Sequence, residues 1–199
     1  MIFKSNIDIY KNAYPNWQKT FRSHDEHLIL YSNYFKESAD KLISSYEGLN
    51  NHSIDSTIIP IIYLYRHSIE LCLKAILYHA YIKRKLDKTK IQDKLNRHNL
   101  SPLWDMVTSE LHKSYSFAKD NESKKVLRKL HVLIIELNNF DPYSIYFRYP
   151  FDQQLEENVY GDGKENFGID YIHMKNEVNF LYEKLYYWIY DKVSKDNYV

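Results

Sequence analysis

The sequence predicts an all-α protein, folded as one helical bundle of about five helices over residues 1–199. Only 4 glycines and 5 prolines interrupt the chain, which is too few for the many tight turns of a β-sandwich or barrel. Long segments instead repeat apolar residues every three to four positions, the period of an amphipathic helix. A hydrophobic content of 44% beside 27% charged residues is enough to build one buried core.

The first helix is predicted to begin after Ser23 and to end near Gly48. Ser23 and Glu26 have the spacing of a capping box, in which each side chain accepts a hydrogen bond from the other residue's backbone. Apolar residues then recur with helical spacing at Leu28, Tyr31, Phe35, Leu42 and Tyr46. Residues 1–22 form an aromatic lead-in segment that we expect to be ordered, and residues 50–56 are predicted to be a polar loop.

A longer second helix is predicted from Thr57 to Arg84, with Pro60 tolerated in its first turn. By length alone, its apolar stretch over residues 58–82 could cross a bilayer. Hydrocarbon would penalise the four ionisable residues near its centre, which are Arg66, His67, Glu70 and Lys74. The amino-terminal segment lacks the features of a signal peptide. We therefore expect a cytoplasmic protein without a membrane partner.

Two further helices are predicted between the second helix and residue 138. A charged connection over residues 83–97 contains a short helical piece, and Ser101 then caps a helix with Pro102 at its first position. That helix is predicted to end near Phe117. The next helix spans residues 122–138 and has a core face of Val126, Leu127, Leu130, Leu133, Ile134 and Leu137.

The segment from Phe140 to Gly168 is predicted to be a loop or a small hairpin, because it holds three of the four glycines and two prolines. An irregular segment of this length in a compact domain usually has a function. Asp170 is predicted to cap the last helix, which reaches Val193 and is rich in aromatic residues.

A polar stripe on the second helix is the most informative feature of the sequence. At ~100° per residue, Arg66, Glu70, Lys74 and His67 fall on one narrow arc. The stripe is flanked by Tyr63, Tyr78 and Tyr81, and the rest of the helix is apolar. Charges on a central helix need partners, because their desolvation otherwise costs several kcal/mol. We therefore expect the stripe to face a tyrosine-lined cleft.

Partners for the stripe are available further along the chain. His98 lies just before a predicted helix, and Arg148 lies in a dense aromatic and charged run over residues 141–152. Arg148 is predicted either to fasten the loop to Glu70 or to bind an anion. Tyr149 and Asp152 of the same run are further candidates for ligand binding.

Several classes of chemistry are excluded by composition and motif. A net charge of +1 argues against a protein that coats nucleic acid over its whole surface. Cys72 is the single cysteine, so a disulfide framework and a thiolate zinc cluster are excluded, and we expect its thiol to be buried and inert. The sequence contains neither the G-x-x-x-x-G-K-[ST] phosphate loop nor the G-x-G-x-x-G motif. It also lacks the H-E-x-x-H pattern of a zinc-binding helix. The run from His24 to His27 is predicted to be a hydrated helix start, and we expect no metal and no cofactor.

Three short strings carry a family resemblance. They are YLYRHSIELCLKAILYH, HNLSPLW and DPYSIYFRYPFD. Together they resemble a bacterial group in the HEPN-like helical superfamily, over about residues 24–193. The resemblance implies an antiparallel helical bundle, frequently dimeric. The aromatic-rich last helix is the expected surface of the homodimer that the resemblance implies. It also implies a metal-independent ribonuclease of phage defence or of a toxin–antitoxin pair, or a relative that only binds. RNA or a nucleotide, a second copy and a protein from a neighbouring gene are the implied partners.

The sequence departs from this family at the catalytic motif. Catalytic HEPN ribonucleases carry an arginine followed after four to six residues by histidine, near the start of a late helix. Here only Arg22 and His27 have that spacing, and they lie where the first helix begins. Cleavage would therefore use the stripe, with His67 or His98 in acid–base transfer and Arg66, Lys74 or Arg148 on the phosphate.

Three hypotheses follow from these observations. The first is a HEPN-type ribonuclease whose catalytic residues are Arg66, His67 and His98. The second is a module that binds a nucleotide, RNA or protein without turnover, through Tyr63, Glu70, Lys74, Arg148, Tyr149 and Asp152. The third is purely structural: a buried ion network of Arg66, Glu70, Lys74 and Arg148 would fasten the loop over residues 140–168 to the bundle.

Overall fold

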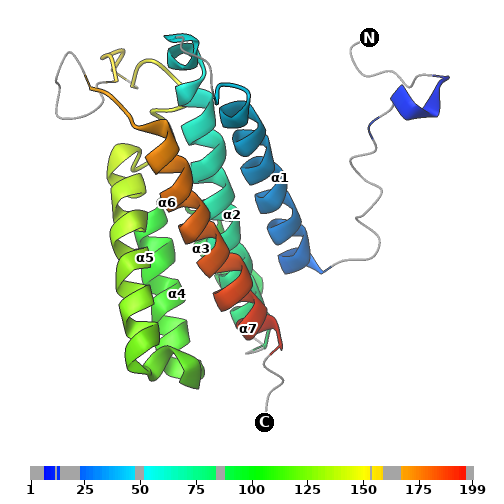
Figure 1. Cartoon of the computed structure of the whole chain (residues 1–199). Helices are drawn as coiled ribbons and strands as arrows, with labels where there is room; N and C mark the ends of the chain where they lie inside the picture. Colours follow the sequence, from blue (N-terminus) through cyan, green and yellow to red (C-terminus); the bar gives the residue numbers. More distant parts are fainter. Residues whose placement is uncertain are drawn as a thin grey trace.

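The computed structural model describes residues 7–11, 13, 23–47, 52–83, 88–152, 154–158 and 167–195. Within these residues the protein is an all-α bundle, as predicted (Figure 1). Its elements in chain order are η1 (Ile9–Lys11), α1 (His24–Ser44), η3 (His52–Ser56), α2 (Ile58–Lys83), α3 (Lys88–Leu95), α4 (Leu100–Ser114), η4 (Ser116–Lys119), α5 (Asn121–Phe140), α6 (Tyr171–Glu183), η5 (Lys184–Tyr190) and α7 (Asp191–Lys195).

The start of α1 confirms the predicted capping box. The backbone N–H of Ser23 donates to Glu26 Oε2 at 2.8 Å, and the Glu26 N–H donates to Ser23 Oγ at 3.5 Å. The predicted loop before α2 is wrong in part, because residues 52–56 form the 3-10 helix η3. In the lead-in segment Tyr10 is 93% exposed, whereas Tyr14, Trp17 and Phe21 lie outside the described residues.

Helix α2 agrees with its predicted bounds and occupies the centre of the bundle. It packs against α1 along most of its length and also contacts α4, α6 and η5 (Figure 1). Its apolar arc supplies much of the main core, including Ile69, Leu73, Ile76 and Leu77. No helix in the described part of the chain is long and apolar enough to cross a membrane.

The start of α4 corrects the predicted cap. Asn99, not Ser101, is the N-cap residue, and its side chain accepts a hydrogen bond from the Ser101 N–H at 3.2 Å. Pro102 therefore lies in the third helical position, where its missing N–H still costs nothing because the first four N–H groups have no partner within the helix. Helix α4 ends at Ser114, and Phe117 belongs to the following 3-10 turn.

The last helical stretch agrees with its predicted bounds but is less regular than predicted. Asp170 caps it, since its Oδ1 accepts from the His173 N–H at 2.9 Å. Between α6 and α7 the chain forms the π-helix η5, and the N–H of Asp191 donates to the carbonyl of Tyr186, five residues earlier. The described part of the segment before α6 is irregular, as predicted, with one isolated bridge between Phe151 and Glu157.

The arrangement of the helices brings distant segments to one end of the bundle. Helix α1 runs toward the end at which α2 begins, and α5 runs toward the same end and leads into the irregular segment (Figure 1). The first half of α2, the start of α4 and the end of α5 meet there. The residues that the sequence marked as candidates lie in this region.

Candidate functional site

The polar stripe of α2 is a buried ion network. Arg66, Glu70 and Lys74 are 0%, 1% and 7% exposed. Glu70 lies between the two cations: its Oε2 accepts from Arg66 Nη1 at 3.2 Å and its Oε1 from Lys74 Nζ at 2.8 Å. The three charges are one turn apart on a single helix face, so their side chains reach each other directly. The expectation that these charges need partners is confirmed.

Arg66 joins three segments of the chain. Its Nη2 donates to the carbonyl of His98 at 2.8 Å, just before α4 begins. Its Nε donates to the carbonyl of Asp141 at 3.1 Å, where α5 ends, and lies 3.7 Å from Asp141 Oδ2. A guanidinium has several N–H donors in a rigid plane, so it can bond to acceptors on several segments at once. Arg66 therefore fastens the start of α4 and the end of α5 to α2.

Asp141 is the loop residue that reaches the stripe. Of the two roles predicted for Arg148, the contact that fastens the loop to Glu70 is wrong, because Arg148 Nε donates to the Ser144 carbonyl instead. Asp141 is fully buried, and its Oδ1 accepts from the N–H groups of Ile145 at 2.7 Å and Tyr146 at 3.1 Å. An aspartate directly after a helix can hold the next turn through its own side chain, whereas an arginine seven residues later emerges at the surface.

His98 is the exposed member of the network. Its Nδ1 lies 3.0 Å from Glu70 Oε1, while its side chain is 57% exposed. Burial alone would raise the pKa of Glu70, but the ion pair and hydrogen bond with Lys74 and the hydrogen bond with His98 lower it. Glu70 is thus a carboxylate and only accepts hydrogen bonds. Nδ1 of His98 is therefore the donor, and Nε2 is the basic nitrogen of the neutral ring.

His67 and Tyr63 lie on the side of α2 that faces α1. The His67 ring packs edge-on against Phe35, with centroids 4.5 Å apart, and parallel to Tyr63 at 5.8 Å. Burial lowers the pKa of His67, although nearby Glu70 opposes the shift. His67 is half-buried among aromatic rings, so His98 is the more accessible of the two candidate imidazoles.

The loop after Asp141 presents Arg148 and Tyr149 at the surface. Buried Phe147 anchors this loop, and the guanidinium of Arg148 lies 5.9 Å from the centre of the Tyr149 ring. A cavity of about 490 Å³ adjoins both residues and is lined by Ile59, Tyr146, Phe147, Arg148, Tyr149, Pro150, Phe151, Glu157 and Asn158. Asp152 instead closes a turn, because its Oδ1 accepts from the N–H groups of Gln154 and Glu156.

The predicted site residues thus fall into three groups. Arg66, Glu70, Lys74 and His98 form one hydrogen-bonded network. Arg148, Tyr149 and Asp152 lie on the loop that Asp141 fastens beside that network, and Tyr63 and His67 pack toward α1. Among the described residues, no group of three or more His, Cys, Asp or Glu side chains is placed to hold a metal ion.

Comparisons of the chain with protein-family models, with curated proteins and with solved structures give no match. The likeness to the HEPN group therefore rests on the three sequence strings that carry it.

A second buried polar cluster was not foreseen from the sequence. Asp25 is 6% exposed, and its Oδ2 accepts from Tyr190 at 3.1 Å and lies 2.7 Å from His79 Nδ1. The predicted hydrated helix start is therefore wrong for this residue. Burial alone would raise the pKa of Asp25, but the hydrogen bonds with His79, Ser23 and Tyr190 and the charge of His79 lower it to about 2. No local sequence pattern predicts this cluster, because its members come from three separate helical segments.

A groove between α4 and α5 carries a positive surface. Its volume is about 420 Å³, and its lining consists of Trp104, Thr108, His112, Lys124, Leu127, Arg128 and His131. Two of these side chains are permanently cationic, two are imidazoles and none is acidic. Such a lining attracts anions, phosphate groups among them.

Proposed function

We propose that this protein is a metal-independent endoribonuclease of the HEPN-like class, acting in phage defence or as the toxin of a toxin–antitoxin pair. The observation that carries the proposal is the contact between His98 and Glu70. An exposed imidazole is held at Nδ1 by a buried carboxylate, which orients the ring and leaves Nε2 toward solvent as a base. The three family strings supply the substrate class.

The proposed reaction uses the 2′-hydroxyl of the RNA as the nucleophile. His98 Nε2 accepts the proton of that hydroxyl, and the 2′ oxygen bonds to the adjacent phosphorus. The bond from phosphorus to the 5′ oxygen breaks, and this oxygen takes up a proton from the imidazolium. The products are a 2′,3′-cyclic phosphate and a 5′-hydroxyl end. The Glu70 carboxylate stabilises the imidazolium formed between the two proton transfers.

Arg148 is the proposed phosphate-binding group. It is exposed, and its loop is fastened through Asp141 to the same network as His98. Exposed Tyr149 beside it offers a ring on which a base can stack. Arg66 is fully buried and already bonded to two carbonyl groups, so it acts as a positioning residue. The positive groove between α4 and α5 offers further contacts to the RNA backbone.

One observation favours the alternative, a module that binds a nucleotide or RNA without cleavage. The cavity beside Arg148 has several aromatic residues in its wall, and a cation next to aromatic rings can hold a phosphate and a base without any acid–base group. This alternative predicts binding that depends on Arg148 and does not depend on His98.

The test is incubation of the purified protein with total RNA and with synthetic tRNA in the presence of a chelator. We expect new fragments with cyclic phosphate ends from the wild type and none from His98→Ala. His24→Ala is the matched control, since it removes an exposed histidine outside the network, and it should cleave like the wild type. Intact RNA with all three proteins, or equal cleavage by His98→Ala, overturns the ribonuclease proposal. Intact RNA together with binding lost in Arg148→Ala selects the alternative.

A further inference from the structure

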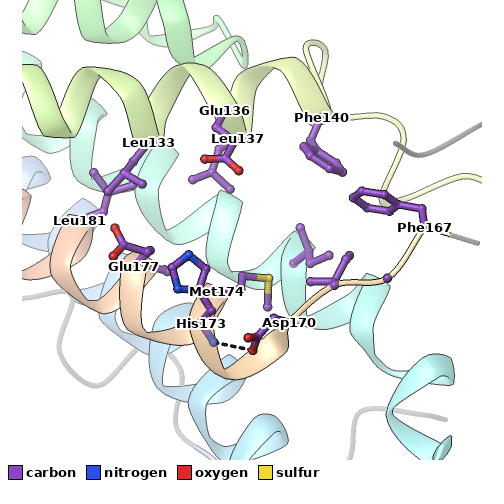
Figure 2. A pocket seen from close by; sticks show the side chains of 14 residues that line it. Leu133, Glu136, Leu137, Phe140, Phe167, Asp170, His173, Met174, Glu177 and Leu181 are labelled. Carbon is purple, nitrogen blue, oxygen red and sulfur yellow. Dashed lines mark hydrogen bonds between the residues drawn. The ribbon is translucent and has the colours of Figure 1, made fainter. Parts of the chain in front are cut away.

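A cavity between α5 and α6 is separate from the His98 network and has a different chemistry. Its volume is about 400 Å³, within the range of small-ligand sites (Figure 2). Helix α5 contributes Leu133, Leu137 and Phe140 to one wall, and Met174 projects into it from α6. Ile62 of α2 also lines the cavity, so its apolar wall comes from three helices that are distant in the sequence.

The outer end of the cavity is formed by two aromatic rings. The centroids of Phe140 and Phe167 lie 5.5 Å apart, and their planes are inclined by 39°. Figure 2 shows the pair at the end of α5, where the chain approaches α6. Met174 adds a deformable thioether to the wall, which can adapt to the shape of an apolar group. A ligand with an apolar body would be enclosed on several sides.

The lining of the cavity carries three carboxylates and one imidazole, that of His173. Glu136 from α5 and Asp170 and Glu177 from α6 or its start lie in the lining, and none of the lining residues is a lysine or an arginine. Lys129 pairs with Glu177 at 3.1 Å, and Asp170 caps α6, so these two carboxylates are partly engaged. Glu136 is exposed, and Figure 2 shows its carboxylate between the two helices. An anionic ligand would be repelled here.

We propose that this cavity binds an organic cation with an apolar body, of the hydrophobic primary amine class. The apolar body lies against Leu133, Leu137 and Met174, and the ammonium group lies near Glu136. The combination of an apolar wall and an acidic rim selects this class over neutral and acidic molecules of the same shape. The aromatic pair at the outer end adds a favourable face for a cation. This site is independent of the proposed RNA cleavage.

The test compares three probes of one shape: 4-phenylbutylamine, 4-phenylbutanol and 4-phenylbutyrate. The readouts are calorimetric titration and NMR of 13C-methyl methionine, in which the signal that Met174→Leu removes reports on the cavity. We expect the amine to shift the Met174 signal and to bind about tenfold or more tightly than the alcohol and the acid. An unmoved Met174 signal, or equal affinities for amine and alcohol, overturns the proposal.

Two variants separate the contribution of the Glu136 charge to amine binding from that of the shape of the cavity. Glu136→Gln should lower the affinity for the amine by about five- to tenfold and leave the weak affinity for the alcohol unchanged. Glu183→Gln removes an exposed carboxylate of α6 that does not line the cavity, and it should bind the amine like the wild type. Both residues are exposed, so neither change disturbs the core. Unchanged amine affinity in Glu136→Gln refutes the role of charge complementarity and with it the proposal.

Discussion

His98 Nδ1 lies 3.0 Å from Oε1 of Glu70, and this contact joins an imidazole that is 57% exposed to a carboxylate that is 1% exposed. The same oxygen accepts from Lys74, while the other oxygen accepts from Arg66. A surface histidine is thereby tied to the centre of the bundle. The network serves stability and the orientation of a reactive group at once, and the two roles can be separated by mutation.

Removal of the Glu70 carboxylate should strongly destabilise the fold. Glu70→Ala leaves Arg66 and Lys74 buried with their shared counter-ion gone, and we expect the free energy of unfolding to fall by ~3–5 kcal/mol. Urea denaturation followed by circular dichroism measures this loss. Glu122→Ala is the control, because it breaks an exposed surface pair with Lys125 and should change stability little. Equal stability of the two variants would contradict a structural role for the network.

Asp141 should control the order of the loop that carries Arg148. Asp141→Ala removes the acceptor for two backbone N–H groups and one partner of Arg66, so we expect a loss of ~2–4 kcal/mol. Amide hydrogen exchange at Ile145 and Tyr146 should become faster at the same time. Asp141→Asn keeps an acceptor oxygen and should retain slow exchange at these two amides. Slow exchange in Asp141→Ala would show that the loop does not depend on this side chain.

Arg148 should contribute to RNA affinity and little to folding. We expect Arg148→Ala to weaken RNA binding by about tenfold at constant salt, with unfolding unchanged, because its guanidinium is exposed and its hydrogen bond stays within its own loop. Filter binding over a series of salt concentrations measures the effect. Lys113→Ala removes an exposed cation at the end of α4 and serves as the comparison. An equal loss in both variants would indicate a general charge effect with no specific role for Arg148.

The Asp25 cluster should make stability depend on acid pH. The folded pKa of about 2 lies below the usual 3.8, so the folded state binds fewer protons than the unfolded chain between these values. The stabilisation from Asp25 is complete above about pH 5, amounts to about 2 kcal/mol, and is lost as the pH falls through about 2. Asp25→Asn should therefore be less stable than the wild type at pH 6 and nearly equal at pH 2. A difference that is constant with pH would exclude titration of Asp25 as its source.

Helix positions and caps were predictable because they depend on nearby residues. The capping box of Ser23 and Glu26 and the cap at Asp170 each join residues three positions apart. The buried stripe of α2 was predictable in part, since periodicity shows that Arg66, Glu70 and Lys74 share one face of an apolar helix. The cap of α4 was misplaced by two residues because Asn99 and Ser101 are both good N-cap residues, and spacing alone does not choose between them.

By itself, the sequence determined that this chain is an all-α bundle with a charged stripe on its central helix, and that the stripe requires partners. Only the tertiary structure decided which partners those are. Arg66 meets Asp141 across 75 positions, and Tyr190 meets Asp25 across 165. Local periodicity reports which residues share a face of one helix, whereas the choice of partner depends on how the faces of all helices pack together. For this reason three features could be found only in the folded molecule. They are the contact between Arg66 and Asp141, the burial of Asp25 and the cavity between α5 and α6.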